Sequence, residues 1–176
     1  MPAMVAKKID QSKRAALFGG VSAHTRPIRP PWTDEERLAD ACTRCGDCMS
    51  ACPERVLVAG QGGFPEFNPG QGTGACTFCR ACVEACDAPV FDPARITPWS
   101  LIVHIENISC LAHAGIHCSS CSDACDEDAV QMRPRIGGPP LPTLSEAKCT
   151  GCGACVGICP GQAVTLFESN NPEVLG

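Results

Sequence analysis

The sequence has no tyrosine, and aromatic residues make up only 5% of its 176 positions. Hydrophobic residues reach 44% only when cysteine is counted among them. A chain of this length with so few large apolar side chains needs something besides a conventional core to hold its fold. No stretch approaches the roughly 18 consecutive apolar residues that a membrane-spanning helix requires. We therefore expect no transmembrane segment.

The first 31 residues lack the pattern of a secretory signal. Their longest apolar run is interrupted by Gly19, Gly20 and Ser22, and no small-residue cleavage site follows it. Lys13-Arg14 faintly echoes a twin-arginine signal, but a lysine replaces the first arginine and the apolar region is missing. We therefore expect a cytoplasmic protein, in which cysteines stay reduced instead of forming disulfides.

No catalytic constellation is recognisable. The serines lie in no motif with His and Asp, and there is no Gly-rich dinucleotide or phosphate loop. The four histidines are scattered; His113 and His117 lie where one could tune or replace a metal ligand, although a surface loop is the simpler interpretation. We expect no enzyme whose side chains do the chemistry, but a protein whose chemistry belongs to a cofactor.

Cysteine is what the sequence has in abundance, with 16 residues in four groups of four. Groups one, two and four read C-x2-C-x2-C-x3-C, whereas group three opens with C-x7-C. The last cysteine of each group precedes the first of the next by 24 positions in all three intervals. The pattern is a four-fold internal repeat with a five-residue insertion in the third unit. The groups are Cys42, Cys45, Cys48, Cys52; Cys76, Cys79, Cys82, Cys86; Cys110, Cys118, Cys121, Cys125; and Cys149, Cys152, Cys155, Cys159.

This spacing is typical of 4Fe–4S clusters. Three thiolates at two-residue gaps wrap a loop over three iron corners, and the fourth cysteine ligates the neighbouring cluster of a two-cluster unit. The proline that often follows the fourth cysteine is present as Pro53 and Pro160, whereas Asp87 and Asp126 stand there in the other two units. The sequence therefore predicts four 4Fe–4S clusters.

The linkers favour pairing group one with two and group three with four. The predicted ligand sets then exchange their fourth cysteines, and a nested pairing of one with four and two with three remains open. The sets are Cys42, Cys45, Cys48 with Cys86; Cys76, Cys79, Cys82 with Cys52; Cys110, Cys118, Cys121 with Cys159; and Cys149, Cys152, Cys155 with Cys125.

Two alternatives concern the metal. Zinc sites usually take two C-x2-C pairs separated by a longer segment, and four crowded runs of four cysteines do not fit that pattern. For the third site, Cys110 must fold back over residues 111–117 to reach the first corner. If it does not, Cys110 is a free thiol and the third site is labile or holds a 3Fe cluster.

Each half of the chain contains one predicted hairpin. Residues 56–58 and 64–67 flank a Gly-rich turn, and residues 130–132 and 141–144 do the same. Residues 99–105 form a predicted strand without an obvious partner. The expected fold is α+β, with two tandem bacterial-type two-cluster ferredoxin modules and a small irregular core built around the clusters. The expected segments are 1–36, basic and flexible; 37–88, module 1; 89–106, connector; 107–170, module 2; and 171–176, tail.

Charge separates the first 31 residues from the rest. They carry six basic residues and one acidic residue, whereas the remaining chain has 8 basic and 18 acidic residues. An acidic body carrying anionic clusters suits docking to basic protein surfaces and argues against nucleic-acid binding. If the basic segment docks a partner, Arg14, Arg29 and Trp32 are the candidate contacts; a solvated end is the simpler interpretation. Thr33 is the predicted N-cap of a helix leading to Cys42.

With these residues in view, the chain resembles the NapF family, the ferredoxin-type accessory proteins of the periplasmic nitrate reductase system. The resemblance extends over nearly the whole chain, although the family typically has two arginines where this chain has Lys13-Arg14. Its particular features are the Arg-Pro-Pro-Trp stretch and the stretched third group. The matching stretches are Ser12-Lys13-Arg14, Ile28-Arg29-Pro30-Pro31-Trp32, Cys42-Thr43-Arg44-Cys45, Gly62-Gly63-Phe64-Pro65, Cys76-Thr77-Phe78-Cys79 and Cys110-Leu111-Ala112.

The resemblance implies a cytoplasmic iron–sulfur protein that contacts the catalytic molybdenum subunit of the reductase before export. It implies a role in maturation of that subunit, by cluster loading or reductive activation. Two alternatives stay open: an electron-transfer ferredoxin within a multi-subunit, membrane-associated oxidoreductase, and, more weakly, a structural metal-binding interaction module.

Overall fold

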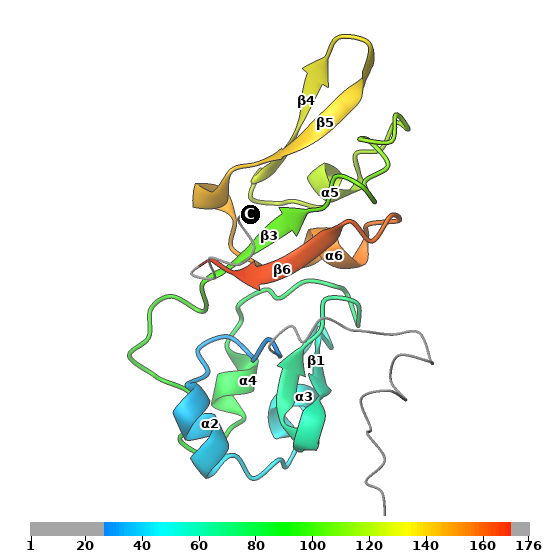
Figure 1. Ribbon diagram of the computed structural model, residues 1–176. Coiled ribbons are helices and arrows are strands. Elements are labelled where there is room, and N and C mark those ends of the chain that lie inside the picture. The colour runs from blue at the N-terminus through cyan, green and yellow to red at the C-terminus, as the bar shows by residue number, and fades with distance from the viewer. Residues whose placement is uncertain (1–26, 170–176) are drawn as a thin grey trace, which may run out of the picture.

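The computed structural model describes residues 27–169, which form short helices and strands in two halves (Figure 1). Within these residues no helix is long and apolar enough to cross a membrane. The first half contains α2 (Glu35–Ala41), α3 (Asp47–Ser50), β1 (Leu57–Ala59), a 3-10 turn (Gln61–Gly63), β2 (Pro65–Phe67) and α4 (Ala81–Glu84). The second half contains β3 (Leu101–Ile105), α5 (Ser120–Asp123), β4 (Val130–Arg135), β5 (Gly138–Leu144), a 3-10 turn (Glu146–Lys148), α6 (Ala154–Gly157) and β6 (Val164–Glu168).

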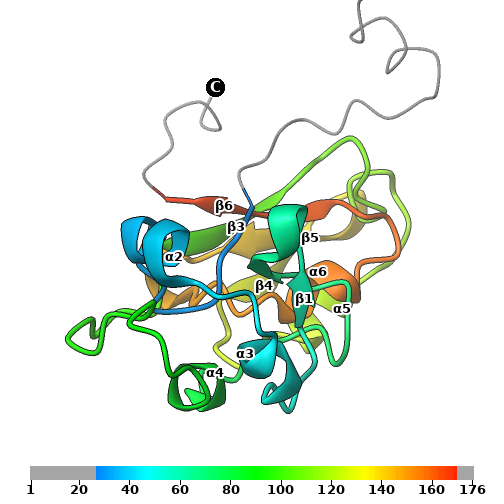
Figure 2. The ribbon, with the colours of Figure 1, turned by 90° about the horizontal axis from the view of Figure 1, so that it is seen from below.

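Each cysteine group folds around a helix of four residues. The third cysteine of each group lies within that helix: Cys48 in α3, Cys82 in α4, Cys121 in α5 and Cys155 in α6. Helix α3 packs against α4, and α5 packs against α6 (Figure 2). Groups one and two therefore share one half of the molecule and groups three and four the other, which favours the sequential pairing over the nested one.

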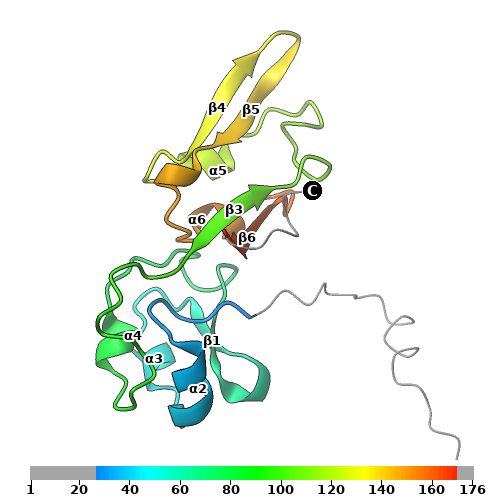
Figure 3. The same cartoon turned by 60° about the vertical axis from the view of Figure 1, so that its left-hand side comes forward.

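Both predicted hairpins are confirmed. Strands β1 and β2 pair antiparallel with Leu57 opposite Phe67, and β4 and β5 pair antiparallel with Val130 opposite Leu144. The β4–β5 turn needs a left-handed residue, which Gly137 supplies at φ 78°. This second hairpin is longer than the sequence predicts and projects from the body of the chain (Figures 1 and 3).

Strand β3 has a partner that the sequence did not reveal. It pairs antiparallel with β6, and Ile105 lies opposite Val164, five residues after Cys159. Strand β3 therefore belongs to a sheet of the second half, whereas residues 89–106 were expected to be a connector. The pairing joins segments at opposite ends of that half, so no turn signal marks it.

The first half repeats this arrangement with the segment before α2. Thr33 forms an antiparallel bridge with Phe91, five residues after Cys86. The Asp34 N–H donates to Val90 O at 3.2 Å, just as the Glu106 N–H donates to Ala163 O at 2.7 Å. Contrary to the expected flexible segment 1–36, residues 27–36 are thus part of the folded body; residues 1–26 lie outside the described part.

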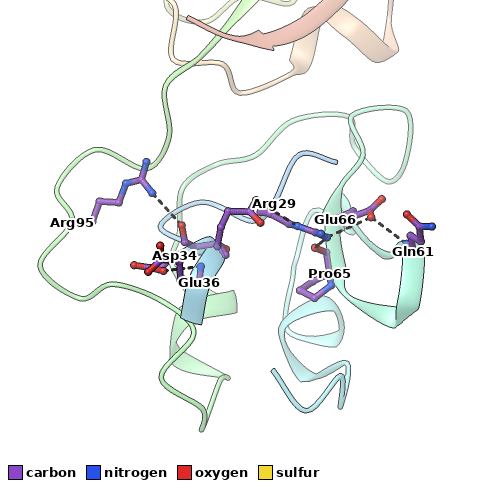
Figure 4. A network of polar contacts seen from close by, with 9 residues as sticks. Arg29, Asp34, Glu36, Gln61, Pro65, Glu66 and Arg95 are labelled. Atoms are coloured by element: carbon purple, nitrogen blue, oxygen red, sulfur yellow. Dashed lines mark hydrogen bonds and ion pairs between the residues drawn. The ribbon is translucent and has the colours of Figure 1, made fainter. Parts of the chain in front are cut away.

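Helix α2 begins one residue later than predicted. Its N-cap is Asp34, whose Oδ1 accepts the N–H groups of Glu36 and Arg37, both at 3.0 Å (Figure 4). The prediction of Thr33 as N-cap is wrong because the backbone of Thr33 is held in the bridge to Phe91. A carboxylate at this position also complements the positive end of the helix.

Aromatic side chains join the two halves. The Trp99 ring lies 5.0 Å from that of Phe67 and 5.5 Å from that of Phe78, both in the first half. Its Nε1–H donates to Thr150 O in the second half at 2.8 Å. Since Trp99 is buried between these groups, it links the halves through packing and through one hydrogen bond.

Replacing Trp99 should weaken this junction. We expect Trp99→Ala to destabilise the protein by about 3–5 kcal/mol, because it leaves a cavity among aromatic rings. Trp99→Phe keeps most of the packing and should lose about 1 kcal/mol with the hydrogen bond to Thr150. Denaturant unfolding midpoints, measured anaerobically, test this, with Ile96→Ala as the control because Ile96 is 91% exposed. An equal effect for Trp99→Ala and Ile96→Ala would contradict the assigned role.

Candidate iron–sulfur sites

We name the four predicted ligand sets by their local cysteines. Site I is Cys42, Cys45, Cys48 and Cys86; site II is Cys76, Cys79, Cys82 and Cys52; site III is Cys110, Cys118, Cys121 and Cys159; site IV is Cys149, Cys152, Cys155 and Cys125. None of these sixteen cysteines, all within residues 42–159, is in a disulfide.

Two sites surround cavities directly. One cavity is lined by all four cysteines of site II, including Cys52 from the other group. A second cavity is lined by all four cysteines of site III, including Cys159. In both sites the fourth cysteine comes from the neighbouring group of the same half, as the crossed assignment expects.

Sites I and IV are indicated by the set of thiols that lie around the cysteine of the short helix. Burial raises the pKa of Cys48 to about 11, and the neighbouring thiols of Cys86, Cys42 and Cys45 add to the rise. Burial likewise raises the pKa of Cys155 to about 12, with Cys152, Cys149, Cys121 and Cys125 adding to it. Cys86 therefore lies near Cys48, and Cys125 lies near Cys155, as does Cys121 of site III.

In the other two sites the cysteine at the same helical position is buried at Cys82 and half-buried at Cys121. Desolvation raises the pKa of Cys82 to about 12 and that of Cys121 to about 11. These thiols hold their protons well above neutral pH when no metal compensates their charge. Since the thiolate is the form that binds iron, cluster binding has to displace these protons.

Cys110 reaches site III through a compact turn. It is 9% exposed and lines the cavity together with Cys118. The insertion between them closes on itself: the Ala114 N–H donates to Cys110 O at 3.0 Å and the Ile116 N–H to Leu111 O at 2.9 Å. The insertion thus returns the chain to the cavity, and neither His113 nor His117 is among the residues lining it.

Left-handed residues shape three of the four cysteine loops. Between the first and second cysteines stand Arg44, Phe78 and Gly151, with φ of 61°, 54° and 70°. Between the second and third stand Gly46, Arg80 and Gly153, with φ of 88°, 64° and 89°. Alternation of left- and right-handed residues turns successive N–H groups toward one concave side, as in many Fe–S sites. The stretched third group lacks this pattern between Cys118 and Cys121.

A buried hydrogen-bond donor without a partner indicates whether the residues of site II fit a cluster. The Trp32 side chain is 5% exposed, and within residues 27–169 its Nε1–H has no hydrogen-bond partner. Trp32 lines the cavity that the site II cysteines surround. A buried donor beside four thiols fits a group that presents acceptor sulfurs. The residues present are therefore compatible with a 4Fe–4S cluster at this site.

The expected partner contacts need correction. Trp32 is not an exposed anchor, since its ring lies under the Arg80 guanidinium at 4.6 Å and packs edge-on to Phe78. Arg29 is also taken up by the fold: its Nη1 donates to Pro65 O at 3.3 Å and pairs with Glu66 Oε1 at 3.4 Å (Figure 4). Arg14 lies outside the described residues.

Sites II and IV meet where the two halves join. The Cys76 N–H donates to Cys152 O at 2.8 Å, so the two cysteine loops are hydrogen-bonded to each other. A Cβ on Gly153 would lie 2.8 Å from Phe67 and from Pro69, so only glycine allows this approach. Sequence reasoning did not find this contact; Gly151, which stands where the first two groups carry Arg44 and Phe78, was the available signal.

Comparison with known proteins agrees with this arrangement. Residues 35–87 match one 4Fe-4S dicluster domain family and residues 116–163 match another. The prediction of two tandem two-cluster units is thereby confirmed. The second match begins after Cys110, so only the geometry of the structure bears on the role of that cysteine.

Several curated proteins are similar over most of their length. The ferredoxin-type protein NapF of Escherichia coli (strain K12) is 39% identical over 90% of this chain and 95% of its own. NapF of Haemophilus influenzae is 44% identical over 83% of this chain and 82% of its own. The methylamine utilization ferredoxin-type protein MauM of Methylorubrum extorquens is 33% identical over 80% of this chain and 72% of its own.

Serine substitutions test which cysteines act together. We expect Cys52→Ser and Cys79→Ser to remove or alter the same cluster, because both residues line the site II cavity. Cys86→Ser and Cys45→Ser should together affect a different cluster, that of site I. Each variant should lose about a quarter of the iron, and electron paramagnetic resonance of the reduced protein identifies the missing signal.

The pairing of variants decides between the assignments. If each group ligated its own cluster alone, Cys52→Ser would affect the same cluster as Cys45→Ser. If the pairing were nested, Cys52→Ser would affect the same cluster as Cys152→Ser. Either result would contradict the crossed sets.

Proposed function

Because the chain belongs to the family of NapF ferredoxin-type proteins, we propose that it holds four 4Fe–4S clusters and assists maturation of the catalytic subunit of periplasmic nitrate reductase. In this proposal it acts in the cytoplasm before that subunit is exported, and it is not itself an enzyme. The observation that carries the cluster part is the gathering of crossed cysteine sets around the cavities of sites II and III.

The clusters would be held by sites I to IV. When bound, 4Fe–4S clusters supply one-electron transfer. The residues of the chain supply the thiolates, the inward N–H groups of the cysteine loops and the apolar walls. Pro31, Trp32 and Leu57 form part of the wall at site II. Such walls limit the access of water and so influence the reduction potential.

We propose two α+β modules of the bacterial two-cluster type. The first includes the bridge between Thr33 and Phe91, and the second extends from β3 to β6. Relative to the expected boundaries, each module therefore starts earlier. The support is that both modules close with the same pairing, five residues after their last cysteine.

A partner can approach the first half closely. Cys45 of site I and Cys79 of site II are exposed, although the other cysteines of both sites are buried or half-buried. Electron delivery and cluster transfer both require such an approach. This accessibility supports a role toward another protein, but it does not by itself distinguish the two kinds of transfer.

A second candidate is an electron-transfer ferredoxin within a multi-subunit, membrane-associated oxidoreductase. The similarity to MauM favours keeping it, because that protein's name connects the same cysteine-rich fold with methylamine utilization. Ferredoxin-type proteins similar to this chain are thus named for more than one system. A structural metal-binding module remains the weakest candidate, because single-metal sites need no crossed sets of four thiols around a cavity.

Deletion of the gene should separate maturation from electron delivery. If the protein assists maturation, nitrate reductase from the deletion strain should have low activity even with an artificial electron donor, because the enzyme itself is incomplete. If it only delivers electrons, activity with the artificial donor should be normal and activity with the physiological donor low. Complementation with the unmodified gene and with Cys79→Ser provides the control.

Physical contact with the partner can be measured in the same strains. The tagged full-length protein should co-purify with the precursor of the catalytic subunit and not with its exported form. Retention of the exported form alone would contradict the maturation role and favour electron delivery.

A further inference from the structure

The chain makes a similar turn after the last cysteine in three of its four units. Three residues after that cysteine stand Arg55, Asp128 and Gln162, with left-handed φ of 56°, 50° and 50°. Each donates its N–H to the carbonyl oxygen of the cysteine, at 3.2, 3.1 and 3.1 Å. The left-handed residue then redirects the next peptide group back toward the cysteine.

In the second half this next peptide group reaches sulfur. The Ala129 N–H donates to Cys125 Sγ at 3.2 Å, and the Ala163 N–H donates to Cys159 Sγ at 3.3 Å. Both alanines are 1% exposed, so water does not compete for these amides. Cys125 and Cys159 are the crossed ligands of sites IV and III. In the first unit Val56 follows the same left-handed turn, but its N–H makes no such bond within the described residues, so the turn permits the bond without ensuring it.

The second unit has Pro89 at the turn position. Its ring fixes φ near −65° and it has no N–H, so it cannot make the left-handed turn or donate to the Cys86 carbonyl. The Val90 N–H donates instead to Ala88 O at 2.8 Å, and the Cys86 thiol turns toward the same oxygen at 3.4 Å. Val90 otherwise matches Ala163: both are buried and both carbonyls accept the equivalent backbone N–H.

We propose that Pro89 is a positioning residue that withholds an amide donor from Cys86 Sγ and thereby keeps the cluster of site I harder to reduce. The proposal rests on the ligand sets of the proposed function. Reduction adds negative charge to a cluster and its thiolates, and an N–H dipole directed at a ligand sulfur stabilises that charge. Hydrogen bonds to the sulfurs are among the factors that set Fe–S potentials. A site without this donor therefore has a lower midpoint potential than the same site with it.

The test is a potentiometric titration of the full-length, cluster-loaded protein, followed by electron paramagnetic resonance. Pro89→Asn restores an N–H and a residue that tolerates left-handed φ. We expect the midpoint potential of the site I signal to rise while the other three stay unchanged. Cys45→Ser identifies the site I signal, and Pro93→Asn, a proline substitution outside the cysteine units, should shift nothing.

The reciprocal variant removes the equivalent amide donor in the second half. Gln162→Pro should prevent the left-handed turn, remove the Ala163 N–H from Cys159 Sγ and lower the midpoint potential of site III. If Pro89→Asn does not assemble its clusters, Gln162→Pro still tests the proposal. An unchanged or lower site I midpoint in a fully loaded Pro89→Asn, or an unchanged or higher site III midpoint in Gln162→Pro, overturns the proposal.

The outcomes also separate this proposal from the proposed function. If the unmodified protein holds no clusters, the proposed function fails. If all four clusters are present and Pro89→Asn shifts the signal that Cys79→Ser removes, Cys86 belongs to site II and the crossed assignment fails. The co-purification experiment tests the maturation role separately from both of these outcomes.

Discussion

The fold depends on the requirement that sixteen cysteines stand in four groups, two of whose crossed sets line cavities in the body of the protein. The helices that present the third cysteine of each group have four residues, too short to be stable alone. The main hydrophobic cluster combines aliphatic side chains such as Leu38, Val56 and Val103 with aromatic residues and with cysteines. Ligation therefore has to supply much of the stability that larger domains obtain from apolar burial.

Pairing between distant segments determines where each module begins and ends. The Thr33–Phe91 bridge and the β3–β6 sheet close the two modules in the same way. The aromatic contacts of Trp99 and the Cys76–Cys152 hydrogen bond then fix one module against the other. Sites II and IV consequently lie at the junction between the two halves.

The cysteine spacing predicted the position of the cysteine loops, and the Gly-rich turns between short apolar runs predicted both hairpins, because these features depend on residues close in sequence. It did not predict the partner of β3 or the burial of Trp32, because both depend on segments separated by tens of residues. Trp32 illustrates the difficulty: a tryptophan after two prolines in a basic segment has the composition of an exposed anchor. Its burial follows from the pairing of Thr33 with Phe91, which no local pattern indicates.

The central claim is that four sets of four thiolates each hold a 4Fe–4S cluster. Its most direct test is the content of iron and acid-labile sulfide in anaerobically purified full-length protein. The account predicts about sixteen of each per chain, since every cube contains four irons and four sulfides. About twelve of each would show that one site, with Cys110 the first suspect, does not hold a complete cube. Zinc in place of iron and sulfide would contradict the account as a whole.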